Sequence, residues 1–121
     1  MRKIVSWGEV NYFLRVVSEK CSETNVDGVY GLPRGGLVLA VMLSHKLGKP
    51  LLLAPTSNSL IVDDICDSGE SLLHYYSNSS AENETKRPII ATMFYKANPL
   101  VKPDIYLYEK KNDWIVFPWE E

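Results

Sequence analysis

Apolar positions near the start of the chain recur with a helical period. Val10, Phe13, Leu14 and Val17 follow one another three and four residues apart, which is the spacing of one helix face. The preceding Ser6-Trp-Gly-Glu9 has the order of a capping box, in which the serine and glutamate side chains satisfy free backbone N–H groups. The pattern predicts an amphipathic helix from about Trp7 to Lys20.

Short apolar runs alternate with further helical segments along the rest of the chain. The expected strands are Val26–Gly31, Leu51–Ala54, Leu60–Ile65, Pro88–Tyr95 and Ile105–Tyr108. The expected helices are Leu37–Leu47, with Gly48 at the position of a helix stop, and about Gly69 to Tyr76. Strands that alternate with helices predict an α/β fold with a mainly parallel central sheet flanked by helices.

Composition narrows the class of protein without naming a function. The chain has 121 residues and a formal charge of −2, which predicts a single domain over residues 1–121 with no basic field for nucleic acid. The longest apolar run, Leu37–Leu43, is too short to span a bilayer. The N-terminus lacks a signal peptide, and Cys21 and Cys66 form no disulfide framework. We therefore expect a soluble cytoplasmic protein.

The most informative segment is Leu60–Leu72, which reads Leu-Ile-Val-Asp-Asp-Ile-Cys-Asp-Ser-Gly-Glu-Ser-Leu. A strand-to-helix turn rich in Gly and Ser exposes backbone N–H groups that can bind a phosphate. Asp63 and Asp64, near the end of the expected strand, can accept hydrogen bonds from ribose hydroxyls or bind Mg²⁺. Asp67 lies in the turn, where it could transfer a proton. The alternative for any one of these residues is an acidic turn that caps a helix.

The ordered string resembles the PRPP-binding signature of the type I phosphoribosyltransferases, with every required position filled. The resemblance implies that Asp63 and Asp64 bind the ribose hydroxyls and Mg²⁺. It also implies that Asp67 is the general acid or base near the purine N7. The residues that would bind the 5′-phosphate are Ser68, Gly69, Glu70 through its backbone, and Ser71.

A second Gly-containing loop, Gly31-Leu-Pro-Arg-Gly-Gly36, lies one βα unit earlier. Its glycines remove obstruction by Cβ atoms, and Arg34 offers a planar donor group suited to a diphosphate. By itself the loop is also compatible with an ordinary turn and an exposed arginine. Its place before the two acids resembles the pyrophosphate loop of the same family, which implies a pyrophosphate site at Pro33, Arg34 and Gly35. The same resemblance makes Pro33–Arg34 the candidate for a cis peptide bond.

Three residues near the C-terminal end of the chain fit a purine base. Lys96 is a donor-only side chain that suits a carbonyl at purine position 6, Trp114 can stack on the base, and the backbone of Ile115 can bind its edge. Each has an ordinary alternative, because a lysine can be merely solvated and a tryptophan can belong to a core or an interface.

The order of these motifs over nearly the whole chain resembles the bacterial xanthine-guanine phosphoribosyltransferases. The resemblance implies Mg²⁺-dependent transfer of a 5-phosphoribosyl group from PRPP to guanine, xanthine or hypoxanthine, in purine salvage. Lys96, Trp114 and Ile115 would bind the base, and Arg34 and Asp67 would act in catalysis.

One departure from the family keeps an alternative function open. Family members carry a long lid loop before the strand with the two acids, whereas only Leu51–Ser59 lies in that interval here. The lid is therefore expected to be shortened or absent. The alternative is a PRPP- or nucleotide-binding sensor with little transferase activity, and an adenine- or pyrimidine-specific transferase is disfavoured by Lys96 and Trp114. The expected assembly is a homodimer, in which a second chain covers the site.

Overall fold

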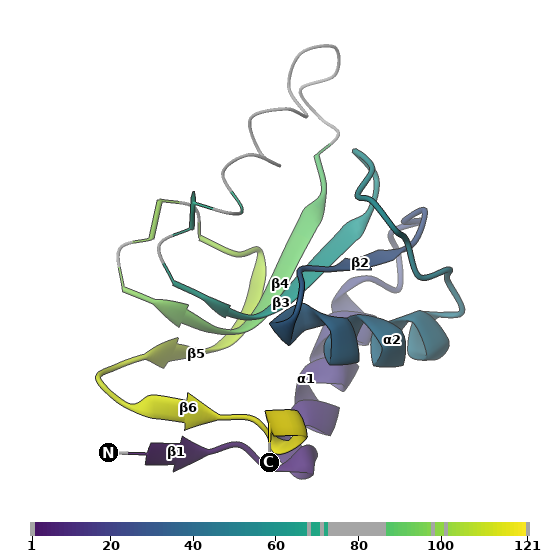
Figure 1. The fold of residues 1–121 in the computed structure, drawn as a ribbon. Helices are drawn as coiled ribbons and strands as arrows, with labels where there is room; N and C mark the ends of the chain where they lie inside the picture. The colour runs from purple at the N-terminus through teal and green to yellow at the C-terminus, as the bar shows by residue number, and fades with distance from the viewer. Residues whose placement is uncertain are drawn as a thin grey trace.

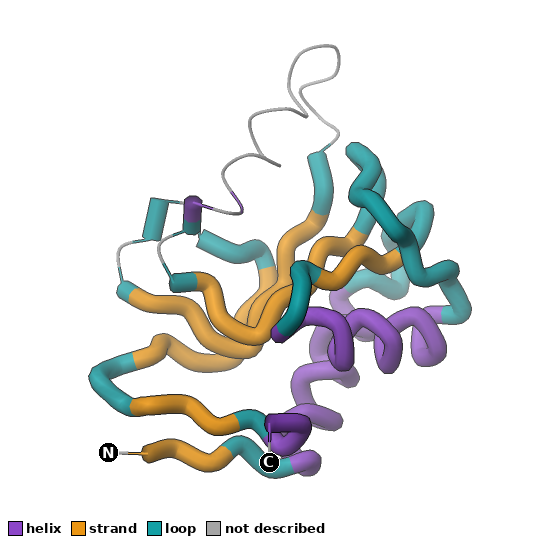
Figure 2. The backbone as a smooth tube through the Cα atoms, in the orientation of Figure 1, coloured by secondary structure: helices purple, strands orange, loops and turns teal. Residues whose placement is uncertain are grey.

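The computed structural model describes residues 2–67, 69, 70, 72, 87–97, 99, 100 and 102–120. Four strands form a parallel sheet in the order β2-β3-β4-β5, and a smaller sheet pairs β1 with β6, also in parallel (Figures 1 and 2). The strands of the larger sheet are Val29–Gly31 (β2), Leu60–Cys66 (β3), Ile89–Lys96 (β4) and Ile105–Lys110 (β5). The other elements are β1 (Arg2–Ile4), α1 (Trp7–Lys20), α2 (Gly35–Leu47), β6 (Trp114–Val116) and the short 3₁₀ turn η1 (Pro118–Glu120). The expected mainly parallel α/β fold is confirmed.

Helix α1 has the bounds that its sequence predicts. Ser6 accepts a hydrogen bond from the Glu9 N–H at 3.1 Å, and the Glu9 carboxylate accepts one from the Ser6 N–H at 3.4 Å. This capping box begins the helix. Its apolar face is buried, as expected from the spacing of those residues.

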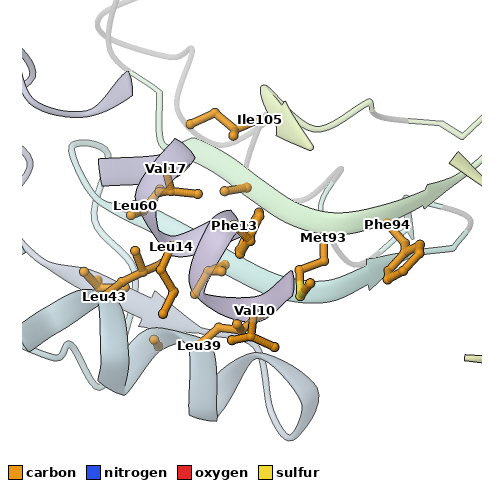
Figure 3. Close-up of a cluster of buried hydrophobic side chains, with 14 of the residues drawn as sticks. Val10, Phe13, Leu14, Val17, Leu39, Leu43, Leu60, Met93, Phe94 and Ile105 are labelled. Atoms are coloured by element: carbon orange, nitrogen blue, oxygen red, sulfur yellow. The ribbon is translucent and has the colours of Figure 1, made fainter. Parts of the chain in front are cut away.

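Helices α1 and α2 cover one face of the larger sheet. Apolar side chains of α1 and α2 pack there against Leu60, Val62 and Met93 in one continuous core (Figure 3). Ile61 and Ile90 point to the opposite face, where they pack with Leu72. Two-sided burial explains why the central strands are apolar at consecutive positions.

Two of the expected strands differ from the structure. Leu51–Ala54 was expected to form a strand, but only Leu51 makes a bridge, to Val29. Strand β2 begins at Val29 rather than Val26, because the Asp27 N–H donates to the Asn58 carbonyl and the Gly28 carbonyl accepts from the Leu60 N–H before the regular pairing starts. The short β2 therefore offers little edge on which another strand could form.

The ends of the other elements shift by one or two residues. Helix α2 begins at Gly35 instead of Leu37 and ends at Leu47, and the φ of 65° at the following Gly48 is the left-handed conformation expected of a helix stop. Strands β3 and β4 each extend one residue further than predicted, so that Lys96 is the last residue of β4. The helix expected from about Gly69 to Tyr76 lies for the most part outside the described residues, as does the connection over residues 77–86.

Candidate active site

The first loop and the two acids of β3 meet at the carboxyl end of the parallel sheet. Gly35 packs directly on the carboxylate of Asp64, and a Cβ at Gly36 would overlap the carbonyl oxygen of Val62. A larger residue at position 36 would require the backbone of β3 to move, and one at position 35 would displace the Asp64 carboxylate. The two glycines thus bring the start of α2 against β3, where ligands bind in open parallel sheets.

The loop itself has the geometry expected of it. The peptide bond between Pro33 and Arg34 is cis. Arg34 is exposed and precedes the first residue of α2, and its own side chain makes no capping hydrogen bond to the helix. The guanidinium therefore lies beside the positive end of a helix, which is a favourable position for an anion.

The regular alternation of β3 breaks at its two acids. Leu60 and Val62 face the helices. Regular alternation would place residue 64 on the same face of the sheet and residue 65 on the opposite face. Instead, Ile65 packs with the core on the helix side. The Asp63 carboxylate accepts a hydrogen bond from the Asp64 N–H at 2.8 Å, and the Asp64 carboxylate accepts one from the Ile65 N–H at 2.7 Å. At these two residues, side-chain carboxylates accept the backbone hydrogen bonds in place of groups on a neighbouring strand. Both acids are only partly buried.

A cavity of about 340 Å³ gathers the residues of both loops. Its lining comprises Pro33, Gly35, Asp63, Asp64, Ile65, Cys66, Asp67, Gly69, Glu70 and Leu72. Gly69 has a φ of 85°, a conformation that favours glycine. Asp67 is exposed at the bend after β3. Of the ribose and phosphate residues predicted from the sequence, Ser68 and Ser71 lie outside what the structure describes.

Burial makes the two acids of β3 costly to ionise. Burial, followed by the charges of Asp64 and Asp67, raises the pKa of Asp63 to about 8. Burial also raises the pKa of Asp64, and the nearby charge of Glu120 adds to this effect. A cation bound between these groups would stabilise their ionised forms.

A second hollow adjoins the first and contains two residues that the sequence analysis missed. Trp119 and Glu120, from η1, line it together with Arg34, Gly35 and Asp64. The Glu120 carboxylate accepts a hydrogen bond from the Phe117 N–H at 2.9 Å. Nothing local marks these residues, because only the fold brings η1 next to α2. The Pro-Trp-Glu sequence after Trp114 was the one available signal.

The residues predicted for the base lie apart from these two hollows. Lys96 is exposed at the carboxyl end of β4, one residue beyond Tyr95, which pairs with Cys66 of β3. Trp114 is 73% exposed on β6, whereas the Ile115 side chain is buried. The Val5 N–H donates to the Val116 carbonyl at 2.8 Å. Because successive residues of a strand direct their backbone groups to opposite edges, the N–H and C=O of Ile115 point away from β1.

The segment that replaces a lid is bound to the opposite end of the sheet. The Val29 N–H donates to the Pro50 carbonyl, and the Leu52 N–H donates to the Val29 carbonyl. The Thr56 hydroxyl donates to the Asp27 carboxylate at 2.9 Å. Residues 48–59 therefore follow the start of β2 and do not extend over the cavity.

Within the described parts of the chain, no helix is long and apolar enough to cross a bilayer.

Known proteins with related sequences have a common description. No family model matches the chain. A xanthine-guanine phosphoribosyltransferase from Cereibacter sphaeroides is 26% identical over 96% of this chain and 85% of the relative. One from Chromohalobacter salexigens is 25% identical over 96% of this chain and 82% of the relative.

Solved structures agree with those relatives. A purine phosphoribosyltransferase from Pyrococcus horikoshii superposes with a TM-score of 0.80 and 30% identity, over 99% of this chain and 94% of its own. A xanthine-guanine-hypoxanthine phosphoribosyltransferase from Helicobacter pylori superposes with a TM-score of 0.77 over 99% and 94%. At 23% identity, the second similarity concerns the fold alone.

Proposed function

Because the chain belongs to the type I phosphoribosyltransferases and is a purine phosphoribosyltransferase, we propose that it transfers the 5-phosphoribosyl group of PRPP to a 6-oxopurine. The base is guanine, xanthine or hypoxanthine, and the products are the nucleoside monophosphate and pyrophosphate. The observation that carries the proposal is the contact of Gly35 with the Asp64 carboxylate, which joins the two phosphate-binding loops in one cavity. The proposed role in the cell is purine salvage in the cytoplasm.

In this proposal the first cavity, which contains Asp63 and Gly69, binds the phosphorylated ribose. Asp63 and Asp64 accept hydrogen bonds from the ribose hydroxyls. The backbone N–H groups of Gly69 and Glu70, together with Ser68 and Ser71, donate to the 5′-phosphate. The cavity lining contains the described members of this set, and its volume of about 340 Å³ suits a small ligand.

The second hollow suits the leaving diphosphate. Negative charge grows on the diphosphate as its bond to the ribose breaks, and Arg34 together with the amino end of α2 stabilises that charge. Pro33 and Gly35 complete the loop. Asp64 and Glu120 line the same hollow. Their negative charges favour the binding of a diphosphate together with a cation over the binding of a diphosphate alone.

The donor set fits Mg²⁺. The metal prefers carboxylate oxygens and binds through one or two carboxylates plus substrate oxygens and water. Asp63 and Asp64 provide two such carboxylates, and because burial raises the pKa of both, a bound cation would favour their ionised forms. Among the described residues no three His, Cys or acidic side chains form a metal site, so substrate and water would complete the coordination. When bound, Mg²⁺ would neutralise charge on the diphosphate.

The base would enter from the side of β4 and β6. Lys96 donates to the 6-oxo group, Trp114 stacks on the ring, and the N–H and C=O of Ile115 bind its edge. Asp67, exposed at the mouth of the cavity, exchanges a proton with N7 of the purine. We further propose that residues 1–121 form a single domain and that the protein is a homodimer. In the homodimer a second chain covers the site and excludes water, which residues 48–59 do not do.

The decisive experiment is a transfer assay with PRPP, MgCl₂ and guanine, xanthine, hypoxanthine, adenine or orotate in turn. We expect a nucleoside monophosphate from at least one 6-oxopurine, and loss of this product with EDTA. Asp67→Asn should lower kcat by about 10²-fold or more. PRPP binding without turnover on any base would support the sensor function instead, and turnover with adenine alone would refute the role of Lys96.

A further inference from the structure

Three aromatic side chains form a stack that links the two ends of the chain. The rings of Phe117 and Trp119 are nearly parallel, with 8° between their planes and 5.0 Å between their centroids. The ring of Trp7 packs on Trp119 at 6.1 Å with a tilt of 58°. Phe117 is buried and contacts Phe94 of β4 edge-on at 5.9 Å. The turn η1 is thus held by the core on one side and by Trp7 on the other.

The middle ring of this stack is also a wall of the site. Trp119 lines the second hollow together with Arg34, Gly35, Asp64 and Glu120. The Glu120 carboxylate is oriented by the N–H of Phe117, the residue on which Trp119 stacks. A shift of the Trp119 ring would therefore move both the wall and the carboxylate next to it.

Trp7 is placed by a rigid local structure. It is the first residue of α1 and directly follows the capping box residue Ser6. The preceding Val5 is buried, and its N–H donates to Val116 of β6 at 2.8 Å. Figure 1 shows η1 lying against the first turn of α1, beside the pair of β1 and β6. Trp7 can thus restrain Trp119, although 48% of its own surface is exposed.

From this geometry we infer that Trp7 is a positioning residue for the diphosphate side of the site, acting through Trp119. Trp7 is not among the described residues that line this hollow. Its ring limits the positions open to Trp119, and so holds the wall and the Glu120 carboxylate opposite Arg34. The inference rests on the proposed function, because it assigns that hollow to the diphosphate.

The same stack leaves the base side independent of Trp7. Trp114 and Ile115 are held by backbone pairing of β6 with β1, over Arg2–Ile4. That pairing does not involve the Trp7 ring. A change of Trp7 should therefore weaken the binding of PRPP and pyrophosphate without weakening the binding of the base, a division that a merely structural tryptophan would not produce.

The test compares Trp7→Ala with Tyr12→Ala, a change of an equally exposed aromatic residue on the same helix. Tyr12 contacts Arg15 and lines neither hollow. Calorimetry with inorganic pyrophosphate and MgCl₂ should show roughly five- to tenfold weaker binding to Trp7→Ala. Tyr12→Ala should bind as the wild type does. In the transfer assay, Trp7→Ala should raise KM for PRPP by a similar factor and leave KM for the base unchanged.

Trp7→Phe, which keeps an aromatic ring on Trp119, should restore most of the pyrophosphate affinity. If Trp7→Ala does not fold, Trp7→Phe is compared with the wild type instead. A Trp7→Phe protein with intact affinity, together with Trp7→Leu of equal stability and weak affinity, supports the inference. A loss of thermal stability in Trp7→Ala with unchanged pyrophosphate affinity overturns it and leaves the proposed function standing. A wild-type protein that binds neither PRPP nor magnesium pyrophosphate overturns both.

Discussion

The carboxylate of Asp64 lies so close to Gly35 that a Cβ at residue 35 would overlap it. Gly35 is the first residue of α2 and Asp64 lies in the middle of β3, and both residues line the two hollows of the site. Glycine is required at this point by the approach of a carboxylate rather than by backbone conformation, since Gly35 is an ordinary helical residue of α2.

Gly35→Ala should therefore abolish most of the transfer activity. The methyl group must push the Asp64 carboxylate out of the cavity, and misplacement of a binding group by about 1 Å can cost on the order of 10²-fold in rate. Gly8→Ala is the matched control, because a Cβ there would meet only the Ser6 hydroxyl at 3.5 Å. Gly8 lies in α1, where alanine should stabilise the fold by roughly 0.5–1 kcal/mol. Wild-type kinetics in Gly35→Ala would show that the two loops do not act together.

The stability of the metal-free protein should fall as pH rises. The pKa of Asp63 is 3.8 ordinarily and about 8 in the fold, so the folded state binds the proton more tightly than the unfolded state does. The stabilisation that the protonated Asp63 contributes is fully present below about pH 4 and is lost as pH rises through about 8. In EDTA, Asp63→Asn should reduce this slope, of which Asp64 keeps a part, and be more stable than the wild type at pH 9 by about 1–3 kcal/mol.

Urea unfolding at several pH values measures this slope, and Glu19→Gln, at an exposed position of α1 outside the cavity, is the control for loss of a carboxylate. If Asp63→Asn and the wild type show the same decline of stability with pH, the raised pKa of Asp63 is not its cause. Addition of MgCl₂ at pH 9 should stabilise the wild type more than Asp63→Asn, because the metal binds the ionised pair.

Ser6→Ala should destabilise the protein by about 1 kcal/mol, since the change removes the side-chain acceptor of the capping box at the start of α1. Ser57→Ala, at an exposed position in the segment before β3, should leave the free energy of unfolding within about 0.5 kcal/mol of the wild type. Chemical denaturation measures both. Equal effects of the two changes would mean that the capping box adds nothing to the stability.

Trp114→Ala should raise KM for the 6-oxopurine by about tenfold or more, because stacking on one base is worth about 1–3 kcal/mol. The side chain is 73% exposed, so thermal stability should change little. Leu53→Ala, at a side chain that is 97% exposed, is the control for loss of exposed apolar surface. A large fall in thermal stability with unchanged base affinity would make Trp114 a structural residue.

Local sequence determined the parts of this protein whose partners are near in the chain. The bounds of α1 follow from Ser6 and Glu9, three residues apart, and the end of α2 follows from the left-handed Gly48. The cavity residues from Asp63 to Leu72 could be grouped from the sequence, because one strand and the turn after it carry them. In each case the interacting groups are separated by a few residues, so that the order of side chains alone specifies the contact.

Tertiary structure alone decided the features that join distant segments. Strands β1 and β6 are three residues long and have no pattern of their own, and they form by pairing Arg2–Ile4 with Trp114–Val116 across almost the whole chain. The same pairing brings Glu120 beside Asp64. Conversely, Leu51–Ala54 has the composition of a strand and forms a single bridge, because an edge strand needs a neighbour of matching length and β2 has three residues.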